Sequence, residues 1–221
     1  MNRLGSETAM QVLGRAEALK AAGRPIINLG VGAPDFRTPG NIVEAGRQAL
    51  AEGWHGYTPA KGIAQLREAV VWDLEQRHGV IADADNVLVV PGGKPTMFFA
   101  MLMLGEPGVE IMYPDPGFPI YRSMVEFSGA TPVPIALEEK RGFSFDPDAV
   151  LSKVSSRTRL LILNSPANPT GGVVGRSELD ALVEGLADFP DLYVMSDEIY
   201  SRIVFGGSEH VSLLEYESLR E

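Results

Sequence analysis

Two polar residues follow the apolar part of a segment near the end of the chain. Asp197 and Tyr200 stand in "LYVMSDEIY", where the apolar side chains of a predicted strand give way to polar ones. A carboxylate at the end of a buried strand is costly unless it meets a cation or hydrogen-bond donors. Asp197 could therefore bind a cationic group of a ligand, or it could cap the following turn. The residues by themselves favour the cap.

A second segment, "LLILNSPANPTGG" from Leu160 to Gly172, joins an apolar run to a loop that holds two Asn and two Pro. Each proline fixes φ and removes a backbone donor, while the amides of Asn164 and Asn168 remain able to bind something else. We predict a stiff loop that presents a polar side chain at a strand end. Because cis X-Pro bonds mark tight, fixed turns, we expect one at Ser165-Pro166, at Asn168-Pro169, or at both.

Glycine-rich segments could bring the backbone close to a ligand. In "VVPGGKPT", Gly93 and Lys94 lie between a predicted strand and a predicted helix, whose free N–H groups would attract an anion such as phosphate. The segment lacks the first Gly and the final Ser/Thr of a Walker A loop, and by themselves these residues favour a tight strand-to-helix turn over a phosphate site. In "NLGVGAPDF", Asp35 stands where a dinucleotide-binding fingerprint needs its third glycine, so the segment is not such a fingerprint. The backbone of Gly32 could approach a substrate, but the residues alone favour a simple turn.

Aromatic and histidine residues give weaker signals. Phe118 in "DPGFPIY" could stack on a flat ligand or cover the core. The three histidines have no metal-ligand spacing, so we predict no metal site.

Composition excludes several classes of function. The 221 residues include no cysteine, which excludes disulfides, thiolate metal sites and cysteine nucleophiles. Net charge is −10 and no cluster of Lys and Arg offsets it, so we expect neither a nucleic-acid nor a membrane partner. The N-terminal "MNRLGSETAM" lacks the apolar core of a signal peptide, and we expect a cytoplasmic location.

Apolar strands alternate with amphipathic helices from the middle of the chain onward. This alternation predicts an α/β fold with a mostly parallel sheet covered by helices on both faces. We predict strands at residues 86–90, 109–113, 131–137, 159–164 and 192–200. We predict helices from a Ser6 cap to Gly23, from an Asn41–Glu44 capping box to Gly53, at 63–78, 95–104 and 120–127, and from Ser177 onward.

The motifs occur in an order that resembles the class I/II aminotransferases, which are fold type I pyridoxal-phosphate enzymes. The resemblance extends from about Leu13 to His210, and its most specific pair is "NSPANPTG" followed by "SDEIY". It is carried by "INLGVGAPDF", "GYTPAKGIAQLREAV", "VVPGGKPTMFFAM", "YPDPGFPIY", "LILNSPANPTGG" and "SDEIYSRI".

The resemblance implies a role for each ambiguous residue. Asp197 would face the pyridine nitrogen of pyridoxal 5'-phosphate and keep it protonated, so that the ring accepts electrons. Tyr200 and Asn168 would hydrogen-bond the phenolic oxygen, and Phe118 would stack on the ring. The remaining implied contacts are Gly93 and Lys94 with the phosphate, Tyr57 with the phosphate of a neighbouring subunit in a homodimer, and Gly32 with the substrate carboxylate.

The resemblance also implies what this chain lacks. The family's Schiff-base lysine should follow "SDEIY", and no lysine here matches it, so we expect a fragment that is inactive alone. Residues 1–37 would belong to the small domain and 38–221 to a truncated large domain, with two strands missing between 86–90 and 193–196. We therefore expect poor stability.

The parent enzyme would transfer an amino group between an amino acid and a 2-oxo acid. Two alternatives remain open: a non-catalytic protein that binds pyridoxal phosphate or a partner, and a lyase or decarboxylase of the same fold.

Overall fold

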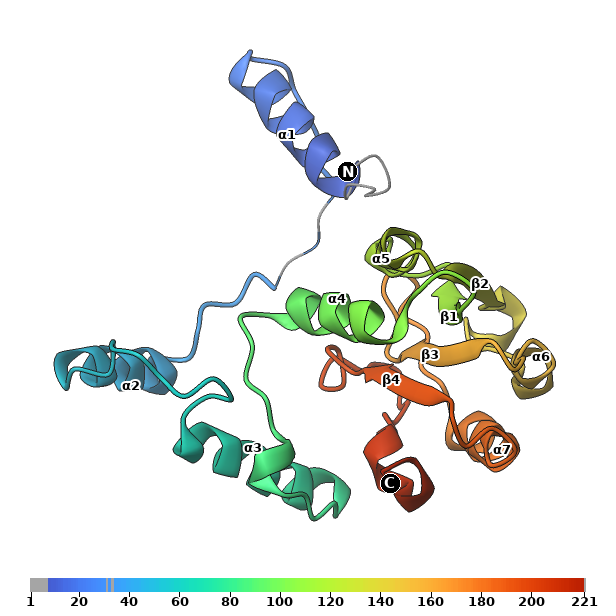
Figure 1. The fold of residues 1–221 in the computed structure, drawn as a ribbon. Coiled ribbons are helices and arrows are strands. Elements are labelled where there is room, and N and C mark those ends of the chain that lie inside the picture. Colours follow the sequence, from blue (N-terminus) through green and yellow to red (C-terminus); the bar gives the residue numbers. More distant parts are fainter. Residues whose placement is uncertain (1–7, 31, 33, 221) are drawn as a thin grey trace. The chain divides into compact units, whose positions relative to one another are not determined.

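The computed structural model describes residues 8–30, 32 and 34–220. These fall into two compact units, one of the described residues up to Ile63 and one of those from Ala64 onward. Figure 1 labels their helices and strands. The predicted boundary between residues 37 and 38 concerns the domains of a complete aminotransferase and stays a prediction. The predicted cap at Ser6 lies outside the described residues.

The first unit consists of two helices and extended segments. Helix α1 spans Thr8–Ala21 and α2 spans Gly40–Ala51. The expected Asn41 cap is wrong, because Pro39 precedes the helix and Asn41 lies within its first turn without a side-chain cap hydrogen bond. The Pro39 carbonyl oxygen accepts hydrogen bonds from the N–H groups of Ile42 and Val43, at 3.0 and 3.1 Å, so α2 begins before Asn41. Glu44 pairs instead with Arg47, at 3.7 Å on the helix surface.

The second unit contains the sheet. Its helices are α3 (Ala64–His78), α4 (Gly93–Leu104), α5 (Ile120–Ser128), α6 (Pro147–Leu151) and α7 (Arg176–Leu186). Its strands are β1 (Glu110–Asp115), β2 (Thr131–Ala136), β3 (Thr158–Asn164) and β4 (Tyr193–Asp197). Single 3-10 turns are η1 (Ala84–Asn86), η2 (Glu139–Arg141), η3 (Leu213–Glu215) and η4 (Glu217–Leu219).

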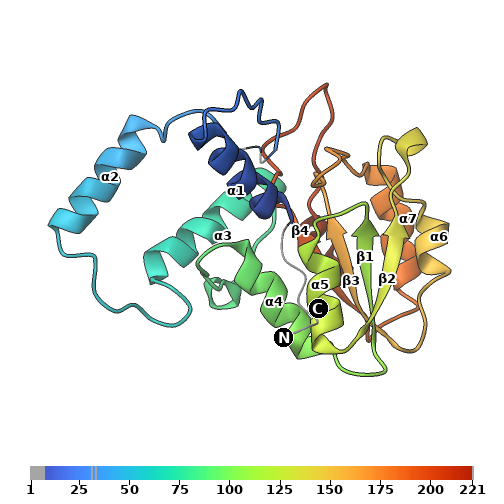
Figure 2. The same cartoon turned by 90° about the horizontal axis from the view of Figure 1, so that it is seen from above.

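The four strands form a parallel sheet in the order β2-β1-β3-β4, which confirms the predicted architecture (Figure 2). Successive side chains of a strand point to opposite faces, so each central strand feeds two cores. On one face, Ile111 of β1 and Ile162 of β3 pack with α4 and α5. On the other, Met112 and Leu161 pack with residues of α6 and α7.

The predicted strand at residues 86–90 is wrong. Asn86 ends η1, and the following residues are extended but belong to no ladder. A strand is defined by hydrogen bonds to a neighbour, and none of the four described strands pairs with this segment. An apolar run indicates that a segment tends to be buried and favours an extended conformation. It does not show whether a neighbouring strand is present to pair with it.

Helix α6 was not expected, although its start signal is present. Asp146 accepts a hydrogen bond from the N–H of Asp148, and Pro147 occupies the first turn. This combination is a strong helix start. No helix in the described part of the chain combines the length and apolar character needed to cross a membrane.

Candidate functional site

The carboxyl ends of β3 and β4 meet at two polar residues. Asn164 and Asp197 are register partners at the last step of the β3–β4 ladder. The Asn164 side chain is buried; its Nδ2 donates to the Asp197 carbonyl oxygen at 2.9 Å, and its Oδ1 accepts from the N–H of Asn168 at 2.9 Å. One amide therefore ties the two strand ends and the loop after β3 together.

The sequence does not indicate this bracing role of Asn164. Both amides are present in the motif, but only Asn168 was expected to contact the cofactor. The side chain of Asn168 is partly exposed at the loop tip. Its position agrees with a ligand-facing amide, but the predicted contact with a cofactor stays a prediction. The burial of Asn164 is the feature that separates the two amides.

The loop after β3 is held by its own hydrogen bonds. A cis bond was expected at one or both of Ser165-Pro166 and Asn168-Pro169; both are cis, and a third cis bond lies at Asp115-Pro116. The N–H of Ala167 donates to the Gly172 carbonyl at 2.9 Å, and the N–H of Gly171 donates to the Ala167 carbonyl at 2.8 Å. Gly171 has φ +72°, a value that L side chains rarely adopt. The prediction of a tight turn with cis X-Pro bonds is confirmed.

The carboxylate of Asp197 is bound on both oxygens. Its Oδ2 accepts a hydrogen bond from the Tyr121 hydroxyl at 2.6 Å, and its Oδ1 accepts a longer one, 3.3 Å, from the N–H of Ile199. The second bond is the turn cap that the sequence allowed. The first was not foreseen, because nothing in the sequence brings α5 to the end of β4.

Burial raises the pKa of Tyr121 well above the ordinary tyrosine value, and the hydrogen bond to Asp197 and its negative charge raise it further. The phenol therefore stays protonated and donates to the carboxylate. Tyr121 has no exposed surface, so it is a fixed part of the core as well as a partner of Asp197.

Phe118 and Lys94 continue the series of contacts that begins at Asp197 and Tyr121. The Phe118 ring meets the Tyr121 ring edge to face, with centroids 5.9 Å apart, and Lys94 Nζ lies 5.9 Å from the Phe118 centroid. Phe118 packs partly on the core, which was its alternative interpretation, yet it keeps some exposure. The structure thus brings Lys94, Phe118 and Asp197 together through Tyr121.

The start of α4 has the backbone form expected of a phosphate loop. Gly92 precedes the helix with φ 92°, Gly93 is its first residue, and no side-chain cap hydrogen bond is made there. A Cβ added to Gly92 or Gly93 would meet no atom within 4 Å. The backbone at this helix start is exposed, and the free N–H groups of a helix N-terminus favour an anion.

The other predicted residues are less constrained. Tyr200 lies in the turn after β4 and is partly exposed. Gly32 and Tyr57 belong to the unit that ends at Ile63, and both are exposed there. Their predicted contacts, with a cofactor and a substrate, stay predictions.

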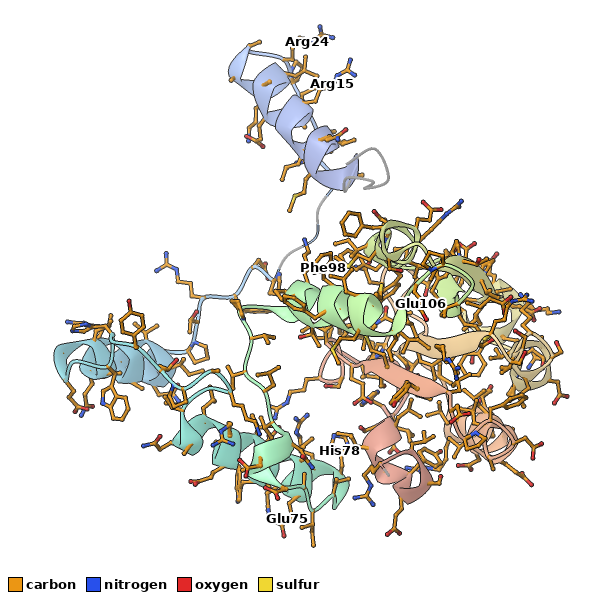
Figure 3. The ribbon with its side chains drawn as sticks, viewed as in Figure 1. Arg15, Arg24, Glu75, His78, Phe98 and Glu106 are labelled. Carbon is orange, nitrogen blue, oxygen red and sulfur yellow. The ribbon has the colours of Figure 1, made fainter. Side chains whose placement is uncertain are left out.

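Two histidines that looked isolated in the sequence form a partly buried hydrogen-bonded cluster with two glutamates. His78, which Figure 3 labels at the end of α3, contacts Glu215 at 3.1 Å. His210 contacts Glu198 at 3.0 Å. The two imidazole rings are 6.2 Å apart, edge to face. These contacts make the cluster an internal brace that joins the end of α3, the turn after β4 and η3.

Glu198 is the centre of this brace and follows Asp197 directly. It accepts hydrogen bonds from Ser212 and from the N–H of Leu213, both at 3.1 Å, as well as contacting His210. Burial alone would raise its pKa, but the hydrogen bonds from His210, Ser196 and Ser212 outweigh burial and lower it. The segment after β4 is thus anchored immediately beside the candidate site.

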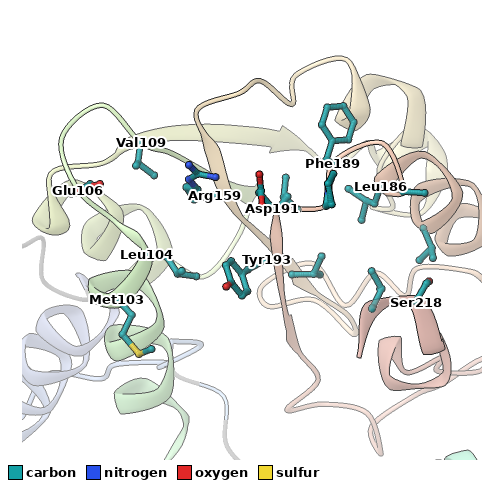
Figure 4. Close-up of a pocket in the computed structure, with 16 residues that line it drawn as sticks. Met103, Leu104, Glu106, Val109, Arg159, Leu186, Phe189, Asp191, Tyr193 and Ser218 are labelled. Carbon is teal, nitrogen blue, oxygen red and sulfur yellow. The ribbon is translucent and has the colours of Figure 1, made fainter. Parts of the chain in front are cut away.

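A cavity of about 740 Å³ lies elsewhere, at the amino ends of the strands (Figure 4). Its lining includes Arg159 near the start of β3, Tyr193 at the start of β4, and Met103 and Leu104 at the end of α4. None of the predicted site residues lines it. Ligands of open parallel sheets bind at the carboxyl ends of the strands, where the candidate site lies. The cavity lies at the opposite, amino ends of the same strands.

Comparison with known proteins defines the class of this chain. The family model of aminotransferase class I and II matches residues 24–219, and the chain belongs to this family. Aminotransferases of this class are pyridoxal-phosphate-dependent enzymes of fold type I, and the predicted fold class is confirmed.

Relatives in sequence and structure agree with this assignment. The chain is 39% identical to a bifunctional aspartate aminotransferase and glutamate/aspartate-prephenate aminotransferase of Petunia hybrida, over 96% of this chain and 44% of that protein. It is 38% identical to an aspartate aminotransferase of Pyrococcus horikoshii, over 86% of this chain and 49% of that protein. The chain spans about half the length of the curated relatives it matches.

Solved structures show the same partial overlap. The aspartate aminotransferase of Rhizobium meliloti matches with a TM-score of 0.91 and 30% identity, over 99% of this chain and 56% of that one. The aspartate aminotransferase of Thermus thermophilus with maleate matches with a TM-score of 0.90 and 34% identity, over 96% of this chain and 56% of that one.

Proposed function

We propose that this chain is the cofactor-binding part of a pyridoxal-phosphate-dependent aminotransferase. The observation that carries the proposal is the carboxylate of Asp197, which lies at the carboxyl end of β4 opposite Asn164 and accepts hydrogen bonds on both oxygens. An anion fixed at this edge of a parallel sheet suits a cationic ring nitrogen.

The residues at this edge fit the cofactor. Asp197 would hold the proton on the ring nitrogen, and the open helix start at Gly93, with Lys94 beside it, would bind the phosphate. Phe118 would cover one face of the ring, while Asn168 and Tyr200 would donate hydrogen bonds to the phenolic oxygen. When bound, pyridoxal phosphate supplies an electron-accepting ring that the side chains of the protein lack.

We propose an amino acid and a 2-oxo acid as the substrates of the complete enzyme. The names of the relatives favour aspartate as the amino acid. Gly32 would approach the substrate carboxylate, and Tyr57 would reach the phosphate across a homodimer. We also propose a cytoplasmic location.

A second candidate, non-catalytic binding of the cofactor, is favoured by one observation. None of the five lysines matches the position of the family's Schiff-base lysine, and Lys94 stands at the helix start expected to bind phosphate. For the 221-residue chain alone we therefore propose binding without turnover.

Calorimetric titration with pyridoxamine 5'-phosphate tests the proposal, because this form has no aldehyde and cannot react with surface lysines. We expect saturable binding that weakens on the order of 100-fold in Asp197→Asn, since a partly buried charge pair loses one partner. Asp188→Asn, at an exposed position after α7, is the matched control and should bind like the wild type. Equal affinity of the Asp197 variant and the wild type would refute the proposed site.

A further inference from the structure

Tyr121 is a buried tyrosine that none of the expected cofactor contacts includes. It lies in the first turn of α5 with its side chain fully buried, and its hydroxyl lies 2.6 Å from Asp197 Oδ2. Hydrogen bonds between a hydroxyl and a carboxylate at this distance are charge-assisted and stronger than neutral ones. The contact joins α5 to the end of β4, across 76 residues of sequence.

The hydroxyl has one proton to donate, and the structure commits it to Asp197. Burial raises the pKa of Tyr121, and the carboxylate raises it further, so the phenol stays a donor throughout the physiological range. This donor fixes the position of the carboxylate oxygen it faces. It also restricts rotation of the Asp197 side chain.

The second oxygen of Asp197 keeps acceptor capacity. Its Oδ1 receives the longer 3.3 Å bond from Ile199, and a carboxylate oxygen can accept more than one donor. A protonated ring nitrogen could therefore be accepted while the bond from Tyr121 holds Oδ2.

Phe118 lies two residues before α5, and its carbonyl oxygen accepts a hydrogen bond from the N–H of Tyr121 at 3.1 Å. The two rings meet edge to face at 5.9 Å, so the position of one constrains the other. The start of α5 thereby links the predicted stacking residue to the partner of Asp197.

We propose that Tyr121 is a positioning residue for Asp197, holding the carboxylate in the orientation that receives the ring nitrogen of the cofactor. Tyr121 acts through Asp197 and does not itself touch the cofactor. This inference rests on the proposed function and deepens it.

Two ligands separate this role from a purely structural one. Pyridoxamine 5'-phosphate carries the ring nitrogen, whereas 3-hydroxybenzyl phosphate has a phenol and a phosphate but no ring nitrogen. The wild-type chain should prefer the first. In Tyr121→Phe that preference should fall on the order of tenfold, the equivalent of one hydrogen bond to a charged group. Affinity for the second ligand should stay the same, because it makes no use of Asp197.

The matched control is Tyr113→Phe, which removes a hydroxyl from the same core cluster. It should leave the preference between the two ligands unchanged. Should Tyr121→Phe fold poorly by near-ultraviolet circular dichroism, Tyr121→Met supplies a second side chain without a donor and should show the same loss.

An unchanged preference in a folded Tyr121 variant overturns this inference alone, while the wild-type preference still supports the proposed function. A wild-type chain that binds neither ligand, or binds both equally, overturns the proposed function and this inference with it. A loss of preference in Tyr113→Phe equal to that in Tyr121→Phe also overturns the inference, since general loosening of the core would then explain both.

Discussion

Asn164 and Tyr57 both stand in motifs that resemble the aminotransferases, but the structure surrounds them differently. Asn164 is 6% exposed, and its amide bonds two strand ends and a loop. Tyr57 is fully exposed, in a unit that also exposes Ile27, Leu29 and Phe36 almost completely. The first residue is held by contacts within its own unit, whereas the second lacks comparable burial there.

This difference shows which parts of the motif set the chain can position by itself. The sheet unit supplies a core on both faces of the strands and hydrogen bonds at their carboxyl ends. The unit up to Ile63 presents apolar surface of the kind that is usually covered by another surface. The proposed homodimer, in which Tyr57 reaches a neighbouring subunit, would supply such a cover.

Truncating one leucine in each unit should give the largest contrast. Leu161→Ala, in β3, should lower the free energy of unfolding by about 2–5 kcal/mol, because the side chain is fully buried between strand and helix. Leu29→Ala should change it by less than about 0.5 kcal/mol, because Leu29 is 92% exposed. Urea unfolding of the two variants measures both values, and similar losses would remove the contrast between the units.

The two amides of the loop after β3 should separate stability from binding. Asn164→Ala should cost about 1–3 kcal/mol of unfolding free energy, since it leaves buried partners unpaired. Asn168→Ala should leave stability nearly unchanged but weaken pyridoxamine 5'-phosphate several-fold. Thermal unfolding and calorimetric titration of both variants check this, and the reverse pattern would show that the roles are exchanged.

The smallest expected effect concerns the brace that contains Glu198 and depends on pH. The pKa of Glu198 is lowered in the folded state, so its contribution to stability is complete above the ordinary value of 4.5 and is lost as pH falls through the folded value. Glu198→Gln should cost about 1 kcal/mol near neutral pH, and the difference from the wild type should shrink in acid.

Unfolding measured between pH 7 and pH 3 tests this, with the exposed Glu209→Gln as the matched control. A difference between Glu198→Gln and the wild type that grows in acid would contradict the assignment of the charge to Glu198.

The sequence predicted the four strands of the sheet because each is an apolar run bounded by turn residues. It predicted at least one cis bond in the loop after β3, because prolines concentrate there, and both candidate bonds are cis. It was wrong about residues 86–90, where the apolar pattern is present but no described strand provides the ladder. A pattern within one segment carries no information about its neighbours.

The candidate site shows the same limit. Residue types singled out Asp197 and Asn168, but Tyr121 lies 76 residues from its partner Asp197 and sits in an ordinary helical segment. The paired histidines also come from distant segments, the end of α3 and the loop after β4. Such contacts follow from the packing of helices on the sheet, which becomes visible only in three dimensions.

The most direct test of the account is the place where the cofactor binds. Pyridoxamine 5'-phosphate titrated into isotopically labelled protein should shift the backbone amide signals of Gly93, Asn168, Asp197 and Tyr200, at the carboxyl ends of the strands. Shifts confined instead to residues around the cavity, such as Met103 and Tyr193, would contradict it and move the site to the opposite edge of the sheet.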